Sequence, residues 1–306
     1  MVYHEARMVK GKLQNYLVSN SRENGKWAKE SRFIGYGKIA KDKIKLLKEE
    51  FEREILMSLA SNNLTKDQIS KIENLKKTYI EKVGDLSKEE FEKFEHAFFT
   101  ELTYNSNAIE GSSLSLEDTR LIVNEGITPD GKTLREINEA KNHTESIHFI
   151  NSYKGDLNEE LILRIHAIIL KNISERFAGR YRETNVRIFG SDVHFPDAIK
   201  VQQLVKNVVY WYKKNKTQLH PFELAVVFSM KLVSIHPFID GNGRVSRLVM
   251  NFILKKNGYP WINIYMKQRS NYLKAVRVAN DEKYESIINH CILALEENLR
   301  SFKIIE

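Results

Sequence analysis

The pattern of apolar and polar positions is most informative around residues 222–253. Residues 222–233 are apolar almost all round, which predicts a helix buried on every side rather than an amphipathic one. Apolar residues recur at three- and four-residue spacing from Val245 to Ile253, which predicts a second helix. The stretch 236–247 between them holds His, Asp, Asn, Gly and Arg. Because burying such groups without partners is costly, we expect a ligand there.

Helical periodicity covers most of the remaining chain. An amphipathic stripe predicts a helix over 41–61, and capping boxes at Thr65, Ser87 and Thr133 open further helices. A short helix is expected after Ser115. Further helices are predicted over 158–171 and 201–214, with a last one ending near 302.

Two stretches are predicted to be hairpins instead of helices. Strands flank Asn24-Gly25 within residues 12–34, and a second hairpin is centred on Gly190 within residues 179–197. Since two strands alone are marginally stable, the first hairpin must pack on another element.

Composition indicates the cellular compartment of the protein and shows that positive charge is concentrated near the N-terminus. The 306 residues are 42% hydrophobic and 29% charged, as in soluble globular proteins. No apolar run approaches the roughly 18 residues of a membrane span, the start is polar, and there is one cysteine, so we expect a cytoplasmic protein without a membrane partner. Residues 1–50 hold 12 Lys and Arg against 6 Asp and Glu, within a net charge of +8. Such a segment could meet nucleic acid, but a solvated surface is the simpler interpretation.

Several residues that could be reactive are better explained by packing. His143, His148 and His166 lie on predicted helices without zinc-ligand spacing. His220 sits in a His-Pro-Phe tripeptide expected to be structural, and Cys291 lies in an apolar helical run.

The stretch between the two buried helices has the groups of an anion site. Gly241, Asn242 and Gly243 can turn successive N–H groups toward one point, because glycine tolerates positive φ. The next helix begins there, so its positive end faces the same place. Arg244 and Arg247 share one helical face, and guanidinium groups bind phosphate oxygens bidentately.

Two further side chains indicate catalysis at this anion site. Asp240 supplies a hard oxygen ligand of the kind that Mg²⁺ takes beside substrate phosphates. His236 has a pKa range suited to a general base. The combination predicts transfer of a phosphorus-centred group from a nucleotide.

The stretch His236–Arg247 resembles the Fic family, because it matches the signature H-x-F-x-[DE]-G-N-G-R-x-x-R at every defined position. Most members transfer AMP from ATP to a Ser, Thr or Tyr hydroxyl of a protein. The resemblance implies that His236 deprotonates that hydroxyl and that Asp240 holds Mg²⁺. It further implies phosphate contacts from Gly241, Asn242, Gly243, Arg244 and Arg247. A kinase branch carries Lys where this chain has Gly243, so AMP transfer is favoured.

A second match lies upstream. Ser106, Glu110 and Gly111 fit the family's inhibitory motif [ST]-x-x-x-E-[GN], and its place before the signature corresponds to class II members. The resemblance implies that Glu110 pairs with Arg247 in the place of the γ-phosphate. A carboxylate at a helix C-terminus is unfavourable, which also indicates a partner.

The resemblance extends to two bordering elements. Residues 179–197 resemble the Fic flap, which holds a target segment by strand addition. Val186, Arg187, Ile188 and Phe189 would border the nucleotide or target. Tyr272 and Asn280 occupy places that border adenine in the family.

These matches lead to one expected architecture. We expect a mainly α protein with a Fic-type helical core and a β-hairpin flap. Residues 1–40 would form a basic N-terminal hairpin segment, residues 41–105 a helical subdomain leading into the inhibitory helix, and residues 106–306 the Fic domain.

The expected function is that of an autoinhibited protein adenylyltransferase using ATP and Mg²⁺. Its partner would be a target protein, which could be this chain itself, and a homodimer stays open. Two alternatives remain. The same site could remove AMP from a modified protein, with Glu110 orienting water. The chain could also be a non-enzymatic, basic nucleic-acid-binding regulator, although nucleic acid is not the partner we expect.

Overall fold

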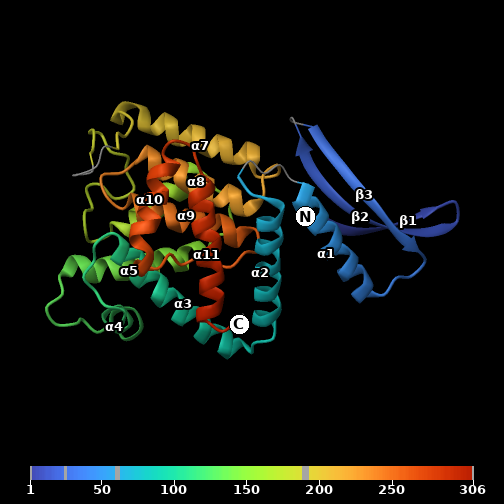
Figure 1. Cartoon of the computed structure of the whole chain (residues 1–306), viewed down its shortest axis with the longest axis horizontal. Coiled ribbons are helices and arrows are strands. Elements are labelled where there is room, and N and C mark those ends of the chain that lie inside the picture. Colours follow the sequence, from blue (N-terminus) through green and yellow to red (C-terminus); the bar gives the residue numbers. More distant parts are fainter. Residues whose placement is uncertain (1, 24–25, 59–62, 188–192, 305–306) are drawn as a thin grey trace.

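A computed structural model describes residues 2–23, 26–58, 63–187 and 193–304. Figure 1 shows a mainly helical body with a small sheet at one side. The strands are β1 (Val2–Val9), β2 (Lys12–Glu23) and β3 (Lys26–Tyr36). The helices are α1 (Lys41–Ser58), α2 (Lys66–Gly84), α3 (Lys88–Ile109), α4 (Leu116–Arg120), α5 (Leu134–Ser152), α6 (Glu159–Ile169), α7 (Val201–Asn215), α8 (Pro221–Ile235), α9 (Asn242–Lys256), α10 (Arg269–Ala279) and α11 (Glu285–Ser301).

Helix starts follow the capping chemistry of the sequence. Thr65, Ser87, Ser115 and Thr133 each accept a hydrogen bond from the backbone three residues on, whose side chain bonds back. These reciprocal bonds satisfy amide groups that a helix N-terminus leaves without partners. The capping boxes predicted at Thr65, Ser87 and Thr133, and the helix start at Ser115, are therefore confirmed. The predicted helix over 41–61 is present to Ser58, and residues 59–61 lie outside the described residues.

The core forms around α8 and α9. The apolar side chains of α8 are almost all buried, as its pattern predicts, and α9 packs against it with Val245, Val249 and Ile253 fully buried. Helices α5, α6 and α7 pack around this pair, and α10 lies against α11. The loop 236–241 therefore starts inside the helical body, where Phe238 is fully buried, and reaches the surface at Ile239.

The N-terminal sheet has one strand more than the sequence indicated. Strand order is β1-β2-β3, all antiparallel, and β1 joins β2 through Lys10 and Gly11, which both have positive φ. That is the backbone of a two-residue hairpin turn, and glycine favours it although lysine does not. The turn predicted at residues 24–25 lies outside the described residues.

One face of the sheet is covered by α1. Val2 and Leu17 form a small core with Phe51, and Ile44 and Leu47 of α1 pack on its edge. Helices α2 and α3 contribute instead to the large core of the body. The sheet and α1 thus have a hydrophobic core of their own, and the predicted domain boundaries stay a prediction.

Within the described residues, none of the helices combines the length and the apolar character that a membrane crossing needs. The cytoplasmic compartment stays a prediction.

Candidate active site

His236 ends α8 in a left-handed conformation, with φ 50° and ψ 60°. Its ring stacks on Phe195 with centroids 4.0 Å apart. Nδ1 is buried and has no hydrogen-bond partner among the described residues. Burial lowers the pKa of His236 to about 4, and the nearby Arg182 adds to that shift. The imidazole is therefore neutral near pH 7 and keeps a nitrogen free to accept a proton.

Arg182 holds the backbone around this histidine. It is 2% exposed, and its guanidinium donates to the carbonyl oxygens of His236 at 2.8 Å, Thr184 at 3.0 Å and Pro196. Its own backbone N–H bonds to Pro237. One buried arginine thus ties both ends of the predicted flap to the turn that carries His236. Sequence reasoning missed it, because no spacing rule marks an arginine that binds only carbonyl oxygens.

His166 supports the loop from α6. Nδ1 accepts the Gly179 N–H at 3.0 Å, so Nε2 carries the proton and donates to the Asp240 carbonyl at 3.1 Å. The ring stacks on Phe238 with centroids 3.7 Å apart, and burial lowers the pKa of His166 to about 4. The sequence placed this residue among the packing histidines, and it packs here under the loop.

In the glycine-rich turn, Gly241 has positive φ, whereas Gly243 lies within α9. Gly241 has φ 79°, and a Cβ there would lie 3.2 Å from Ile169, so glycine fits both the angle and the space. The Asn242 side chain bonds to both the N–H and the carbonyl of Phe238, each at 2.9 Å. This side chain therefore holds the loop closed, and what Asn242 can offer a ligand is its backbone.

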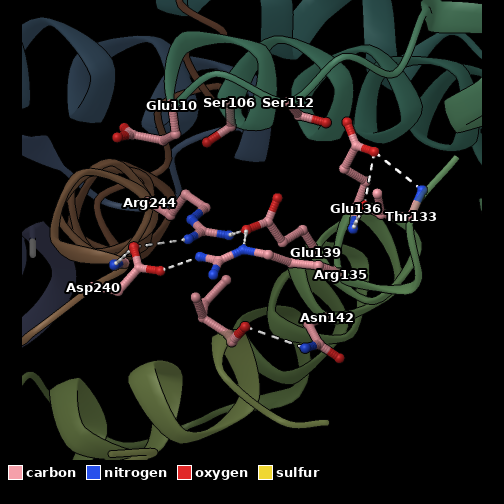
Figure 2. A network of polar contacts seen from close by, with 12 residues as sticks. Ser106, Glu110, Ser112, Thr133, Arg135, Glu136, Glu139, Asn142, Asp240 and Arg244 are labelled. Carbon is pink, nitrogen blue, oxygen red and sulfur yellow. Dashed lines mark hydrogen bonds and ion pairs between the residues drawn. The ribbon is translucent and has the colours of Figure 1, made fainter. Parts of the chain in front are cut away.

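The charged groups beside the turn form one network, which Figure 2 shows between α5 and the loop. Arg244, 2% exposed, reaches Glu139 at 3.2 Å and Asp240 at 3.3 Å. Arg135 bridges the same two carboxylates at 3.2 and 2.5 Å. Burial alone would raise the pKa of Asp240, but Arg244, the Gly241 N–H and Arg135 together lower it, so this carboxylate is ionised.

Arg135 and Glu139 were not predicted as site residues. They lie on α5, where Ile137, Ala140 and Ile147 form a buried apolar face. Glu139 is 9% exposed on that helix. An acidic residue on an apolar helix face is a signal that sequence reasoning could have used.

The end of α3 brings the predicted inhibitory residues to α9. Glu110 pairs with Arg247 at 2.8 Å, and Arg247 also donates to the Ser106 hydroxyl and carbonyl at 2.9–3.2 Å. A Cβ at Gly243 would lie 2.2 Å from Glu110 Oε1, so the carboxylate rests directly on the first turn of α9. Arg269 fixes the end of α3 by bonding to the Ile109 carbonyl at 2.7 Å. Gly111 leaves the helix with φ 105°.

The other predicted contacts are placed as follows. Tyr272 is buried, and its ring centroid lies 6.0 Å from the Arg247 guanidinium carbon. Asn280 caps α10 and accepts a bond from Ser234 at 2.6 Å. Arg187 pairs with His194 in an antiparallel bridge, with Val186 beside it, as a hairpin flap requires. Ile188 and Phe189 lie outside the described residues.

Of the carboxylates at this site, Asp240 is the one that the sequence predicts to hold a metal ion. No cluster of three ligating side chains occurs in the described parts of the chain. Asp240 fits Mg²⁺ nonetheless, because that ion is commonly held by one or two carboxylates together with substrate phosphates and water. A carboxyl group must be ionised to bind Mg²⁺, and the Asp240 carboxylate is ionised.

Residues 156–254 match the model of the Fic/DOC family. The chain is 35% identical over 214 residues to "Protein adenylyltransferase Fic" of Nematostella vectensis, covering 68% of this chain and 49% of that protein. It is also 35% identical over 183 residues to "Protein adenylyltransferase fic-1" of Caenorhabditis elegans, covering 58% and 36%. The chain thus spans half or less of the length of these curated relatives.

Two solved structures share the fold. A Fic domain containing signaling protein from Bacteroides thetaiotaomicron superposes with a TM-score of 0.70 at 25% identity, over 76% of this chain and 97% of that one. A structure of Fic-1 from C. elegans superposes with a TM-score of 0.68 at 25% identity, over 86% and 74%. The match extends well beyond residues 156–254.

Proposed function

Residues 156–254 of this chain form a Fic domain, and from that premise we propose that the protein transfers AMP from ATP to a hydroxyl group of a protein. We propose further that the pair Glu110–Arg247 inhibits this transfer. The observation that carries the proposal is the position of the Glu110 carboxylate, which lies against Gly243 in the first turn of α9 and pairs with Arg247 one turn further on. A neutral histidine lies at the entrance of the same turn.

The chemistry assigned to His236 is general-base catalysis. The target hydroxyl oxygen attacks the α-phosphorus of ATP, the bond from that phosphorus to the bridging oxygen breaks, and diphosphate leaves. The hydroxyl proton passes to an imidazole nitrogen of His236. Its pKa of about 4 keeps the ring unprotonated near neutral pH, and because Nδ1 is buried, Nε2 is the nitrogen left to meet the hydroxyl.

The start of α9 would hold the phosphates. Backbone N–H groups at a helix N-terminus bind anions, and Arg244 and Arg247 add positive charge there. Nε of Arg244 is buried without a partner in the described chain, so a phosphate oxygen would satisfy a donor that now has none. Mg²⁺ bound to Asp240 would neutralise charge on the phosphates.

The inhibition follows from occupied space. Glu110 Oε1 lies 2.2 Å from where a Cβ of Gly243 would be, and it neutralises the guanidinium that a γ-phosphate would need. Arg247 is 6% exposed, so breaking its pair from one side leaves a buried charge without a partner. ATP binding would then need either displacement of Glu110 or a different pose of its phosphates.

The test is the substitution Glu110→Gly. Purified wild type and variant are incubated with Mg²⁺ and ATP labelled in the α-phosphate, and transfer to protein is followed by gel and mass spectrometry. We expect the variant to transfer at least about tenfold faster, which corresponds to about 1.4 kcal/mol. Glu89→Gly, at the exposed start of the same helix, is the matched control and should behave as wild type.

The base is tested in the same background. His236→Ala should lower transfer by Glu110→Gly by about 10²–10⁴-fold, the usual contribution of a positioned base. His148→Ala, an exposed histidine on α5, should leave the rate unchanged. The proposal fails if Glu110→Gly is no faster than wild type, or if the loss of His236 has no effect on it.

A second reaction at this site, removal of AMP, is favoured by one observation. The Glu110 side chain is 37% exposed although its partner is buried, so the carboxylate can also contact and orient water. Release of AMP from a modified protein would then disappear in Glu110→Gly, whereas transfer would rise. If both rates rise together, Glu110 plays no part in removal.

A further inference from the structure

The face of the N-terminal sheet opposite α1 carries side chains that the proposed function does not use. Figure 1 shows the sheet lying to one side of the helical body. We call the surface formed by Tyr3, Arg7, Tyr16, Lys29, Phe33 and Tyr36 the open face. Antiparallel register places Tyr16 opposite Phe33, and side chains alternate between faces, so Leu17 lies on the other face, in the core with α1. A register shift at Asn15–Tyr16 brings Tyr36 opposite Gln14, and therefore onto the same face as Tyr16 and Phe33. Tyr3, Phe33 and Tyr36 are 40%, 45% and 61% exposed.

The aromatic rings of the open face form a row across β2 and β3. Tyr16 and Phe33 have centroids 5.5 Å apart, and Phe33 and Tyr36 have centroids 4.9 Å apart, each pair inclined at 63°. Edge-to-face packing fixes the rings, and although each pair covers one flat side of one ring, Phe33 and Tyr36 keep 45% and 61% of their surface exposed. A fixed, exposed aromatic surface on a sheet is what unstacked bases bind.

Cationic groups lie among these rings. The Arg7 guanidinium is 5.0 Å from the centroid of Tyr16, and the Lys12 ammonium is 5.8 Å from that of Tyr36. Glu5 pairs with Arg7 at 2.7 Å and with Lys29 at 3.2 Å. Two cations thus share one carboxylate, and both ion pairs remain accessible to solvent. Phosphates could therefore recruit Arg7 and Lys29 without breaking a buried interaction.

The charge of the whole segment agrees with this arrangement. Residues 1–40 contain 8 Lys and Arg against 3 Asp and Glu, so this segment carries +5 of the net charge of +8. A positive surface attracts phosphates, and it disfavours pairing with a second copy of itself. An acidic peptide would use the cations but would leave the aromatic row without a partner.

We propose that the open face binds single-stranded nucleic acid. Bases stack on Phe33 and Tyr36, and Arg7, Lys12 and Lys29 contact the phosphates. A duplex hides the faces of its bases, so a single strand is the form that fits an aromatic row. The binding surface is separate from Glu110, His236 and Arg247, so its presence does not depend on AMP transfer.

The test uses the full chain and fluorescence anisotropy with labelled oligouridine and oligothymidine of about 20 nucleotides, and a duplex of equal length. We expect at least one of the single strands to bind more tightly than the duplex; which one binds separates an RNA ligand from a DNA ligand. The double variant Phe33→Ala/Tyr36→Ala should weaken that binding at least about tenfold, since each stacked base commonly contributes that much. Tyr210→Ala, which removes an aromatic ring that is 70% exposed on α7, should leave it unchanged.

Salt dependence tests the cations separately. Lys12→Gln and Lys29→Gln should each reduce the slope of log affinity against log salt by about 0.7. Far-UV circular dichroism checks that the sheet is retained, and AMP transfer in the Glu110→Gly background should not change. The proposal is overturned if single strands bind no better than the duplex, if the aromatic double variant binds as wild type, or if a glutamate-rich peptide competes as well as the oligonucleotide.

Discussion

The loop between α8 and α9 and the open face of the sheet both combine aromatic rings with charges, but they differ in burial. Arg244 and Arg182 are each 2% exposed, whereas Phe33 and Tyr36 are 45% and 61% exposed. In the loop most charged groups already have protein partners; on the sheet much of the ring surface faces solvent. A buried polar group must be satisfied as the chain folds, so the loop is arranged in advance. An exposed polar group remains hydrated and costs little folding free energy without a protein partner. The side chains of the open face can therefore stay available to bind a ligand.

The difference predicts where substitutions act. Changes around the loop should lower the free energy of unfolding, while changes on the open face should leave folding intact and alter only binding.

The sharpest case is Arg182→Met. The substitution removes donors from the carbonyl oxygens of His236, Thr184 and Pro196, so the free energy of unfolding should fall by about 3 kcal/mol. Urea denaturation measures it. Arg180→Met, an exposed neighbour, and Arg7→Met on the open face should each cost less than about 0.5 kcal/mol. Equal losses in all three variants would remove the contrast between the two regions.

Acid should destabilise the helical body. Burial lowers the pKa of His166 to about 4 and that of His143 to about 3, below the usual 6.5. The unfolded chain therefore binds protons first as pH falls, and stability present above pH 6.5 is lost between pH 6.5 and about 4. We expect the free energy of unfolding to be at least about 2 kcal/mol lower at pH 5 than at pH 7.5.

The contribution of a buried histidine is tested by substitution. His143→Gln should reduce that dependence, because it removes one buried titrating group. Stability that is constant between pH 7.5 and pH 5 would show that the buried histidines do not resist protonation.

The smallest effect concerns Gly243→Ala. The new methyl would meet Glu110 Oε1 at 2.2 Å and Arg247 at 3.1 Å, so it should cost about 1 kcal/mol in wild type. In Glu110→Gly the carboxylate is absent, and most of that cost should disappear. Thermal unfolding of the four proteins gives the coupling. Gly84→Ala, with no atom within 4 Å of its Cβ, is the control. If the losses of stability from Gly243→Ala and Glu110→Gly are additive, the Glu110 carboxylate does not contact Gly243.

Part of the fold could be predicted because its causes are local. A capping box depends on two residues three positions apart, and the burial of α8 follows from apolar residues within that one helix. Both features could therefore be read from the sequence. Strand β1 was not visible, because its inner side is covered by α1 from another part of the chain and its turn uses Lys10. The pairing of Glu110 with Arg247 was inferred from motif resemblance rather than from any local rule.

The sequence alone determined the helical class, the helix starts and the chemical groups of the stretch His236–Arg247, because propensity, capping and residue type act over a few positions. Only the tertiary structure decided that Arg182 holds the turn of His236, that Glu139 joins Arg244, and that the Asn242 side chain is used within the loop. Those contacts join segments through burial, and which buried donor meets which acceptor depends on how the whole core packs.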